Sequence, residues 1–505
     1  MQRTFPLSRS AAAVAAISAV LTAAACTVVG PATVNTAAVT RASTAGARPA
    51  TASAGPSATI KGCVVGAWAE DFTDAGRLSW QVRLGADPGL SYGEAVQPLA
   101  AGGVTVFADG DGLYALRLGN GKQLWHRVFG AAKNLAQGYV SDLIAWKGSV
   151  IALVGQGSAT PKLVALNPAT GAVRWTATLG TQSLEFISPV VTSDGVAAIN
   201  VGTQGDTLAA IDLSTGKRLW SRTYLKTPLT QASGTALVVD VRTSFTAPVT
   251  LTGIGGRSGK TLWSRTGFPS WISILSAPGG RVLVDGVNAV PPAPGKKETV
   301  YPVTALSAAT GKTLWQLKTP EQAYAVWPTP AGVAVAAQLF GTTFTKPPAP
   351  QVYLADLVTG KLRWSVTLPE YATVDQSGPA LVTASDVTVI VATADTGTVV
   401  DYSARSGAVR WRAVISAVTG QGRYLARPSG PNVVVTFPLP SVSAASRLLA
   451  LNAATGATKS TSYLPFTSTV GALPTVAGSN VLVEPATASC APPVHPEPPQ
   501  PVATH

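Results

Sequence analysis

The chain of 505 residues has few of the side chains on which metal sites and hydrolytic enzymes depend. Its three histidines are His126, His495 and His505, and its three cysteines are Cys26, Cys63 and Cys490. These residues form no H-E-x-x-H motif and no C-x-x-C motif, and they do not assemble a Ser-His-Asp set. We therefore expect no zinc site, no metal-binding residues and no catalytic triad.

Charge is scarce as well, because charged residues make up 12% of the chain and only 24 of them are acidic. The 37 basic residues give a formal net charge of +13. Such a surplus suits an anionic neighbour, for example lipid headgroups, a cell-wall polymer or nucleic acid. The N-terminal residues argue for export, so we expect no nucleic acid as a partner.

Long apolar runs are missing except at the N-terminus. Arg3 and Arg9 precede the apolar stretch from Ala11 to Ala25, which predicts a signal peptide over residues 1–25. Cys26 follows a run of small residues and resembles the lipid-modified cysteine of a bacterial lipobox, although Ala23 stands where leucine is usual. The resemblance implies diacylation of Cys26 and a lipid anchor on the extracytoplasmic side of the cell membrane. The alternatives are ordinary secretion and an uncleaved anchor.

The segments on either side of the central region lack the large apolar residues that a core needs. Residues 26–60 consist mostly of Ala, Thr, Ser, Gly and Pro, which predicts a flexible tether carrying the lipid anchor. As a random coil this tether would span on the order of 30 Å. Residues 491–505 are rich in proline and are expected to be a disordered tail.

The central region repeats one phrase, seen most easily at residues 163–175 as LVALNPATGAVRW. Each of eight copies carries a glycine: Gly121, Gly171, Gly216, Gly259, Gly311, Gly360, Gly407 and Gly456. A tryptophan follows four residues later in seven copies, whereas the last has Ser460. A half copy with Gly76 and Trp80 precedes them all. The glycines are 43 to 52 residues apart, which indicates one supersecondary unit used repeatedly.

The phrase predicts a β-hairpin. Alternating β-rich residues before the glycine predict a strand, and the glycine supplies the positive φ that a tight turn requires. A hydroxyl or amide side chain precedes all eight glycines and is expected to bond to the turn backbone. A small residue lies six positions before most of the glycines, so something large must pack over it. We expect the tryptophan to begin the returning strand and to wedge between neighbouring units.

The phrase resembles the tryptophan-docking motif of β-propellers of the pyrroloquinoline-quinone (PQQ) type. Asp212, Thr215, Gly216, Lys217 and Trp220 match that motif most fully. The resemblance implies an all-β fold over residues 61–490, an eight-bladed β-propeller with tryptophan-docking motifs. In this interpretation the N-terminal strand with Trp80 completes the last unit, which lacks the tryptophan. Nine blades are the alternative if the two ends of the chain form a composite blade.

The cysteines bear on how the ring closes. If Cys26 carries lipid, Cys63 and Cys490 are left as a pair for a disulfide. Both lie where C-terminal strands would hand over to N-terminal strands, since residues 481–485 resemble the strand that precedes a docking phrase. A bridge there would close the ring and contribute about 4 to 5 kcal/mol in the chain-entropy description. The alternative is two unrelated thiols in flexible ends.

The fold hosts several functions, so the resemblance leaves three interpretations open. The first is a non-catalytic scaffold of the cell envelope that binds an envelope protein, without a cofactor. The second is a PQQ-dependent dehydrogenase, but the chain lacks the adjacent cysteines and the haem motif found in many of those enzymes. The third is a basic rim that binds anionic wall polymer or lipid. That rim would combine two sets of residues at repeating positions: Lys122, Lys217, Lys260, Lys312 and Lys361 after the glycines, and Arg127, Arg222 and Arg265 after the tryptophans.

Overall fold

The computed structural model describes residues between 66 and 483, all of them in the unit that comprises residues 54–505. Its longer gaps are residues 72–76, 84–95, 130–139, 156–160, 181–188, 202–206, 287–301, 339–348, 375–380, 417–424, 439–445 and 465–474. The predicted signal peptide, tether and tail, and with them Cys26, Cys63 and Cys490, lie outside the described residues. The lipid anchor and the disulfide therefore remain predictions.

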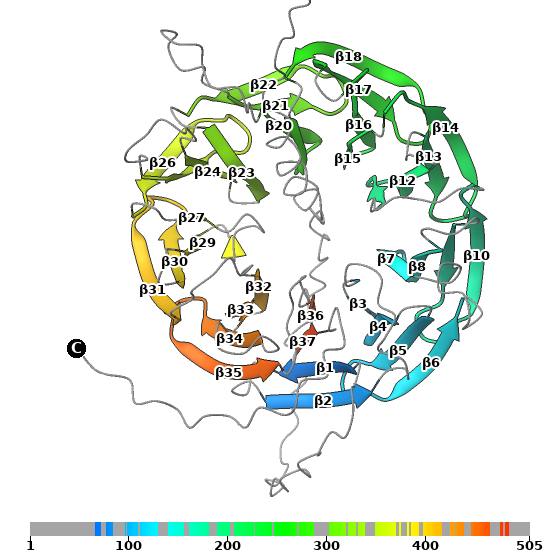
Figure 1. The fold of residues 1–505 in the computed structure, drawn as a ribbon, viewed down its shortest axis with the longest axis horizontal. Helices are drawn as coiled ribbons and strands as arrows, with labels where there is room; N and C mark the ends of the chain where they lie inside the picture. The colour runs from blue at the N-terminus through cyan, green and yellow to red at the C-terminus, as the bar shows by residue number, and fades with distance from the viewer. Residues whose placement is uncertain are drawn as a thin grey trace, which may run out of the picture. The chain divides into compact units, whose positions relative to one another are not determined.

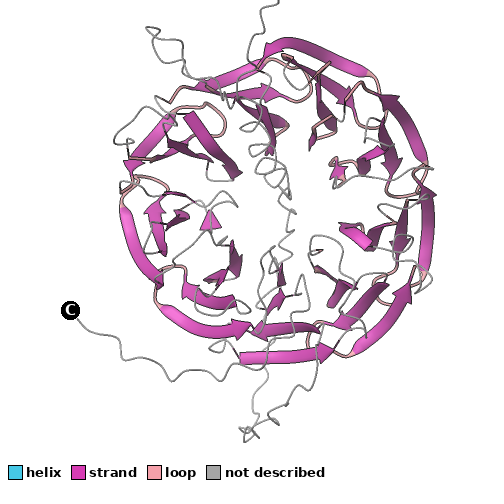
Figure 2. Cartoon of the chain, in the orientation of Figure 1, coloured by secondary structure: helices cyan, strands magenta, loops and turns pink. Residues whose placement is uncertain are grey.

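The described residues form antiparallel β-sheets joined by turns, as the all-β prediction requires (Figure 2). No helix long and apolar enough to span a membrane occurs among the residues that the structure describes. The sheets follow one another around a ring in chain order (Figure 1).

The first four sheets built from consecutive strands begin at residue 99. One comprises β3 (Leu99–Ala101), β4 (Val104–Asp109), β5 (Gly112–Arg117) and β6 (Gln123–Val128). The next comprises β7 (Val140–Trp146), β8 (Ser149–Val154), β9 (Lys162–Leu166) and β10 (Val173–Thr178). It is followed by β11 (Val190–Val191), β12 (Val196–Val201), β13 (Thr207–Asp212) and β14 (Arg218–Thr223). Then come β15 (Thr230–Ser233), β16 (Ala236–Val241), β17 (Val249–Gly255) and β18 (Thr261–Phe268).

The next four sheets repeat this arrangement as far as residue 464. One comprises β19 (Ile272–Ala277), β20 (Arg281–Gly286), β21 (Val303–Ser307) and β22 (Thr313–Leu317). The next comprises β23 (Gln322–Thr329), β24 (Gly332–Gln338), β25 (Gln351–Ala355) and β26 (Leu362–Thr367). A five-stranded sheet follows with β27 (Thr373–Val374), β28 (Leu381–Val382), β29 (Asp386–Ala392), β30 (Gly397–Ser403) and β31 (Val409–Ser416). The last comprises β32 (Leu425–Ser429), β33 (Asn432–Pro438), β34 (Ser446–Asn452) and β35 (Thr458–Leu464).

The two ends of the described chain form a further sheet. It contains β36 (Thr475–Ala477), β37 (Asn480–Val483), β1 (Gly66–Asp71) and β2 (Arg77–Arg83). β1 pairs antiparallel with β37, so that Trp68 lies opposite Val483 and Asp71 opposite Asn480. This pairing confirms the predicted handover from C-terminal to N-terminal strands and closes the ring without a chain connection.

The structure therefore has nine sheets in its described residues, and the ring of eight is corrected to the nine-blade alternative. The reason is that Thr458–Leu464 forms the fourth strand of the last consecutive unit although it has Ser460 in place of tryptophan. The unit needs no strand from the N-terminus. β1 and β2 are thus free to complete β36 and β37.

The hydrophobic core lies between consecutive sheets. All six residues of β8 are buried, as are all six of β12, because both faces of these middle strands are covered by neighbouring blades. Val238 of one blade packs with Ile274 and Val282 of the next in one cluster. The blades whose side chains the structure describes are therefore stabilised by burial against their neighbours, as in other repeat architectures.

Candidate functional site

The repeated hairpins connect the third strand of each blade to the fourth. The eight turn glycines have φ values between 65° and 72°, which confirms the predicted left-handed conformation. In the turn at Gly216, the Gly216 N–H donates to the carbonyl of Asp212 at 2.7 Å. The hydroxyl of Thr215 accepts the N–H of Lys217 at 3.3 Å. The same side-chain bond recurs in all eight turns, as the sequence predicts.

Each of the seven described tryptophans of the repeat docks on the turn of the following blade. A Cβ atom added to Gly311 would lie 2.5 Å from Cδ2 of Trp263, so only glycine permits this approach. The Nε1–H of Trp263 donates to the carbonyl of Ala308 at 2.8 Å. The same ring also covers the small residue of its own blade, since a Cβ on Gly253 would lie 2.1 Å from its Nε1. The wedge predicted from the sequence is confirmed.

The contact repeats around the ring with little variation. The rings that lie against the next turn glycine are those of Trp125, Trp175, Trp220, Trp263, Trp315, Trp364 and Trp411. In six of these docks the structure gives the indole N–H a bond to the carbonyl three residues before that glycine, at 2.7 to 3.2 Å. The motif that defines the repeat is thus an inter-blade joint.

A β-bulge precedes every docking position, and sequence reasoning missed it. In the pairing of β17 with β18, Ile254 lies opposite Thr261 and Gly253 opposite Trp263, so Leu262 has no partner. The nine bulged residues are Ser79, Leu124, Arg174, Leu219, Leu262, Leu314, Arg363, Arg410 and Lys459. A bulge bends the strand and re-aims the side chain that follows it. This accounts for how a strand residue reaches the neighbouring blade.

Three docks carry an arginine two residues after the tryptophan, in the pattern Leu-Trp-x-Arg. Arg265 donates from Nη1 to the carbonyl of Gly311 and to the hydroxyl of Thr313, both at 2.9 Å. Arg127 donates to the carbonyl of Gly171 at 3.1 Å, and Arg222 donates to the carbonyl of Gly259. We call these three residues the forward arginines, because each bonds to the next blade.

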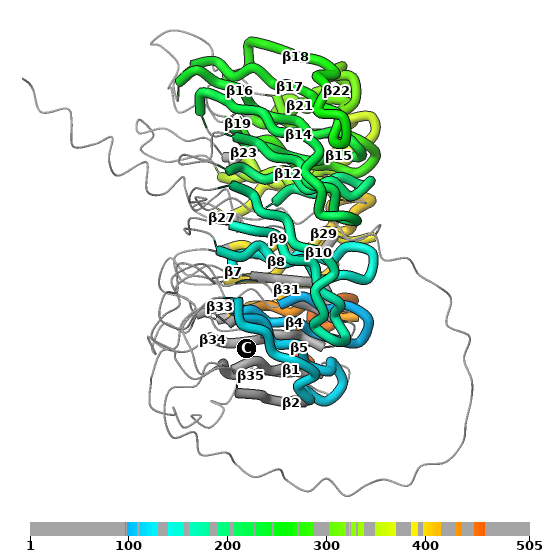
Figure 3. The backbone as a smooth tube through the Cα atoms, turned by 90° about the vertical axis from the view of Figure 1, so that its right-hand side faces the viewer, coloured from blue at the N-terminus to red at the C-terminus, as the bar shows by residue number. Residues whose placement is uncertain are grey.

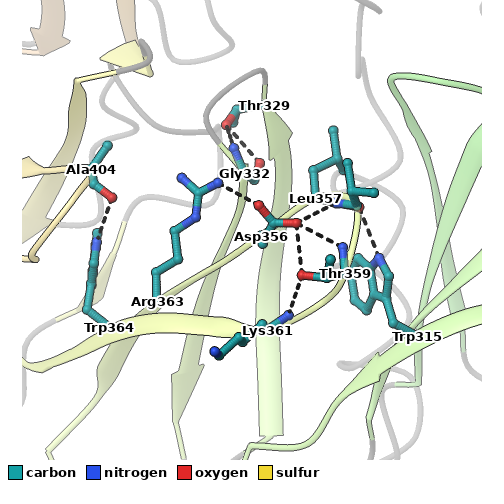
Figure 4. A network of polar contacts seen from close by, with 11 residues as sticks. Trp315, Thr329, Gly332, Asp356, Leu357, Thr359, Lys361, Arg363, Trp364 and Ala404 are labelled. Atoms are coloured by element: carbon teal, nitrogen blue, oxygen red, sulfur yellow. Dashed lines mark hydrogen bonds and ion pairs between the residues drawn. The ribbon is translucent and has the colours of Figure 1, made fainter.

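Three other docks carry the arginine before the tryptophan, at the bulge, in the pattern Arg-Trp. Arg174 donates to the Ser149 hydroxyl of its own blade at 2.8 Å. Arg363 pairs with Asp356 of its own turn at 2.7 Å (Figure 4). Arg410 pairs with Asp386, also in its own blade. We call these the own-blade arginines.

Asp356 shows what the own-blade arrangement does to a turn. Its carboxylate accepts the N–H groups of Val358 and Thr359 and the hydroxyl of Thr359, besides the guanidinium of Arg363. Arg363 and these turn donors hold the pKa of Asp356 well below its usual range. The acidic residue of the repeat therefore organises its hairpin, as expected for a capping residue.

The two sets of residues predicted to form the basic rim differ in exposure. The forward arginines, which were expected on that perimeter, are half-buried and bond to neighbouring turns. The five lysines after the glycines are exposed. The rim is thus made by the lysines and not by this set of arginines.

A second group of polar residues occupies equivalent positions in the second strands of three consecutive blades. Asn200 donates to the carbonyl of Pro228 at 3.0 Å, and Asp240 accepts the N–H of Leu229. Both side chains thereby hold the segment that leads into β15. Asp285 has the equivalent place in β20 and is 3% exposed, but its Oδ1 has no hydrogen-bond partner.

Burial controls the protonation of these carboxyl groups. It raises the pKa of Asp285 to about 7, with no opposing contact. It also raises the pKa of Asp240, against the effect of Arg242, which forms an ion pair with it. Asp401, which accepts the Thr388 hydroxyl at 2.7 Å, has its pKa raised by burial to about 6.

These carboxylates do not fit a quinone and Ca²⁺ site. Asp240, Asp356 and Asp401 are each engaged by side chains of their own blade. Within the described part of the chain, no three His, Cys, Asp or Glu side chains come close enough together to hold a metal ion. His126, the one described histidine, stacks on Tyr114 with 4.0 Å between ring centroids.

The chain matches the family described as outer membrane protein assembly factor BamB, over residues 140–270 and 300–488. This is more than half of its length. The chain belongs to this family. Its propeller of PQQ-like repeats agrees with that membership. No curated protein sequence matches the chain.

Solved structures resemble it at low identity. A eukaryotic initiation factor is 10% identical, with a TM-score of 0.52, over 80% of this chain and 97% of the other. A quinohemoprotein alcohol dehydrogenase from Comamonas testosteroni is 13% identical, with a TM-score of 0.41, over 88% and 79%. BamB from Moraxella catarrhalis is 15% identical, with a TM-score of 0.34, over 77% and 88%. At these identities the likeness concerns the fold alone.

Proposed function

We propose that this family member is a non-catalytic propeller that serves as a scaffold in the cell envelope. In this proposal an acyl group on Cys26 anchors the chain on the extracytoplasmic side of the cell membrane, and the ring binds an envelope protein. The family described as an outer membrane assembly factor supports a protein partner of this kind. No cofactor is part of the proposal.

One observation carries the proposal: the residues that define the repeat are occupied in holding the ring together. The tryptophans and turn glycines form the docks, and Asp356 and the forward arginines bond to hairpins. A rigid ring with repeated edges and loops is well suited to present a surface to another protein. The motif that suggests a quinone family thus has a structural explanation.

Recovery of partners from native membranes tests the binding role. The full chain would carry a C-terminal tag, be cross-linked in cells and be isolated in mild detergent. We expect a defined set of envelope proteins in stoichiometric amounts. A Cys26→Ser chain is the matched control, because it loses the acyl anchor while keeping the same propeller. Recovery of no envelope protein, with an unaltered envelope in a deletion strain, would overturn the scaffold proposal.

The second candidate, a PQQ-dependent dehydrogenase, is tested separately. The purified chain would be incubated with PQQ and Ca²⁺ and assayed for alcohol-dependent dye reduction. We expect neither stoichiometric retention of the quinone nor turnover. Retention of one quinone per chain together with substrate-dependent reduction would replace the scaffold by the enzyme.

A further inference from the structure

Exposed apolar side chains gather at the ends of three consecutive hairpins. Leu262 is 48% exposed, Leu314 45%, Val358 60% and Leu362 43%. They lie within three residues of the turn glycines Gly259, Gly311 and Gly360. Leu262 and Leu314 are bulged residues, which have no opposite partner in their sheets.

An exposed lysine follows the glycine in each of these turns. Lys260, Lys312 and Lys361 use their backbone N–H groups to close the turn. In the described part of the structure none of their ammonium groups has an ion-pair partner. The acidic residue of the third turn, Asp356, is already paired with Arg363. The hairpin ends are therefore positively charged as well as apolar.

The three hairpins end at the same edge of the ring, because each joins the third strand of its blade to the fourth (Figure 3). The blades β15–β18, β19–β22 and β23–β26 are neighbours. We call the resulting surface the hairpin arc. It consists of Lys260, Leu262, Lys312, Leu314, Val358, Lys361 and Leu362.

We propose that the hairpin arc binds the surface of an anionic lipid bilayer. Lysines beside exposed leucine and valine match the boundary between headgroups and acyl chains, where cations meet anionic lipid and apolar residues enter the boundary. A soluble anionic polymer would use the lysines but leave the apolar residues in water. The net charge of +13 favours the same encounter. Vesicle binding by the hairpin arc does not depend on the proposed function. Its biological setting does, because the proposed function places the chain next to a membrane.

The experiment uses the Cys26→Ser chain without the predicted signal peptide, which has no acylation site. It measures binding of this chain to phosphatidylcholine vesicles with and without phosphatidylglycerol. We expect binding only with phosphatidylglycerol and a decrease at high salt. K260Q/K312Q/K361Q should weaken binding roughly tenfold or more. L262S/L314S/V358S, which keeps all charges, should also weaken it. K162Q/K226Q/K318Q removes equal charge from the opposite strand ends and should bind within about twofold of the parent.

Several results would overturn the proposal. One is equal loss of binding in both lysine variants, which would indicate net charge alone. Another is undiminished binding in the leucine and valine variant together with tight binding to soluble poly(glycerol phosphate), which would indicate a polymer site. All variants begin at residue 26 and carry the same tether, so that segment contributes equally to each. Partner capture is measured without vesicles, which separates failure of this proposal from failure of the scaffold proposal.

Discussion

The blade β15–β18 and the blade β23–β26 use the same tryptophan joint but place their arginine differently. In the first, Arg265 follows Trp263 and bonds to Gly311 and Thr313 of the next blade. In the second, Arg363 precedes Trp364 and bonds to Asp356 of its own turn. The first arginine adds to the contact between blades, whereas the second stiffens the hairpin that receives a neighbour's ring. The position of the arginine relative to the tryptophan thus decides which of two contacts it supports.

The blade β19–β22 has neither arrangement. Its sequence at the dock is Leu-Trp-Gln-Leu, so Trp315 bonds to the carbonyl of Leu357 at 3.0 Å without help from a guanidinium. Asp285 of the same blade lies on the strand face of Leu283, which packs against residues of β23 and β24. We therefore expect the interface between the blades β19–β22 and β23–β26 to depend most on apolar packing. An ionised Asp285 should destabilise this interface.

Loss of a docking ring should have the largest effect. Trp364 is 7% exposed and Trp263 is half-buried. Trp364→Ala should lower the free energy of unfolding by about 4 kcal/mol through lost burial and the cavity left behind. Trp263→Ala should cost less, because Arg265 still connects the two blades. Urea unfolding of both variants measures the difference, and an equal or larger loss for Trp263→Ala would contradict a supporting role for the forward arginine.

A methyl group at a docking glycine should have the next largest effect. Gly311 and Gly148 have similar φ values, 67° and 71°. A Cβ at Gly311 would collide with Trp263, whereas a Cβ at Gly148 would meet nothing within 4 Å. Gly148→Ala should cost about 1 kcal/mol from backbone strain alone, and Gly311→Ala about 3 kcal/mol with the added overpacking. Similar urea midpoints for the two variants would show that the ring does not need close contact with the glycine.

Removal of the buried charge of Asp285 should stabilise the blade β19–β22, which has no arginine at its dock. The pKa of Asp285 is about 7 in the folded chain against 3.8 for the ordinary group, so the folded state binds this proton more tightly. Its contribution to stability is present in acid and is lost as the pH rises from about 4 to about 7. Asp285→Asn should therefore stabilise the fold at pH 8 by about 2 kcal/mol.

The matched control for this prediction is Asp356→Asn. Asp356 has a lowered pKa, so its stabilising contribution is present at neutral pH and is lost in acid. Asp356→Asn should therefore destabilise the fold at pH 8. Thermal unfolding at pH 5 and pH 8 checks both signs. A loss of stability in Asp285→Asn at pH 8 would mean that the carboxylate has a partner in solution.

Removal of the arginines should have the smallest effects. Arg265→Ala loses two hydrogen bonds between blades and should cost about 1.5 kcal/mol. Arg174 is exposed, so Arg174→Ala, which loses one bond to Ser149 of its own blade, should cost about 0.5 kcal/mol. Arg265→Lys should recover little, since an ammonium group does not reproduce the fork of donors. Equal urea midpoints for the two alanine variants would contradict the difference in stabilisation expected between forward and own-blade arginines.

The hairpins could be predicted from the sequence because their signals are local. Thr215, Gly216 and Trp220 lie within six residues of each other, and each has the conformation or contact that its chemistry favours. The bulges could not be predicted, since Ser79, Leu124 and Lys459 have nothing in common chemically. A bulge is defined by the partner strand and not by the residue that occupies it.

Features that depend on distant parts of the chain were harder to predict. The partners of Arg222 and Arg265 lie 37 to 48 residues away, so exposure on a rim was the natural expectation. The number of blades depends on whether the strand with Trp80, β2, is the outer strand of the last consecutive unit or belongs with β1 to the sheet of β36 and β37. The likeness of residues 481–485 to a second strand does predict where the ring closes, as the pairing of β1 with β37 confirms. The bond between Cys63 and Cys490 across it stays a prediction.

Amide hydrogen exchange in Arg265→Ala and Arg363→Ala tests most directly whether the position of the arginine decides which contact it supports. In Arg265→Ala we expect faster exchange at residues 307–313 of the next blade. In Arg363→Ala we expect faster exchange at residues 356–361 of the same hairpin, with residues 403–408 of the next blade less affected. Faster exchange at residues 403–408 than at residues 356–361 in Arg363→Ala would contradict the account.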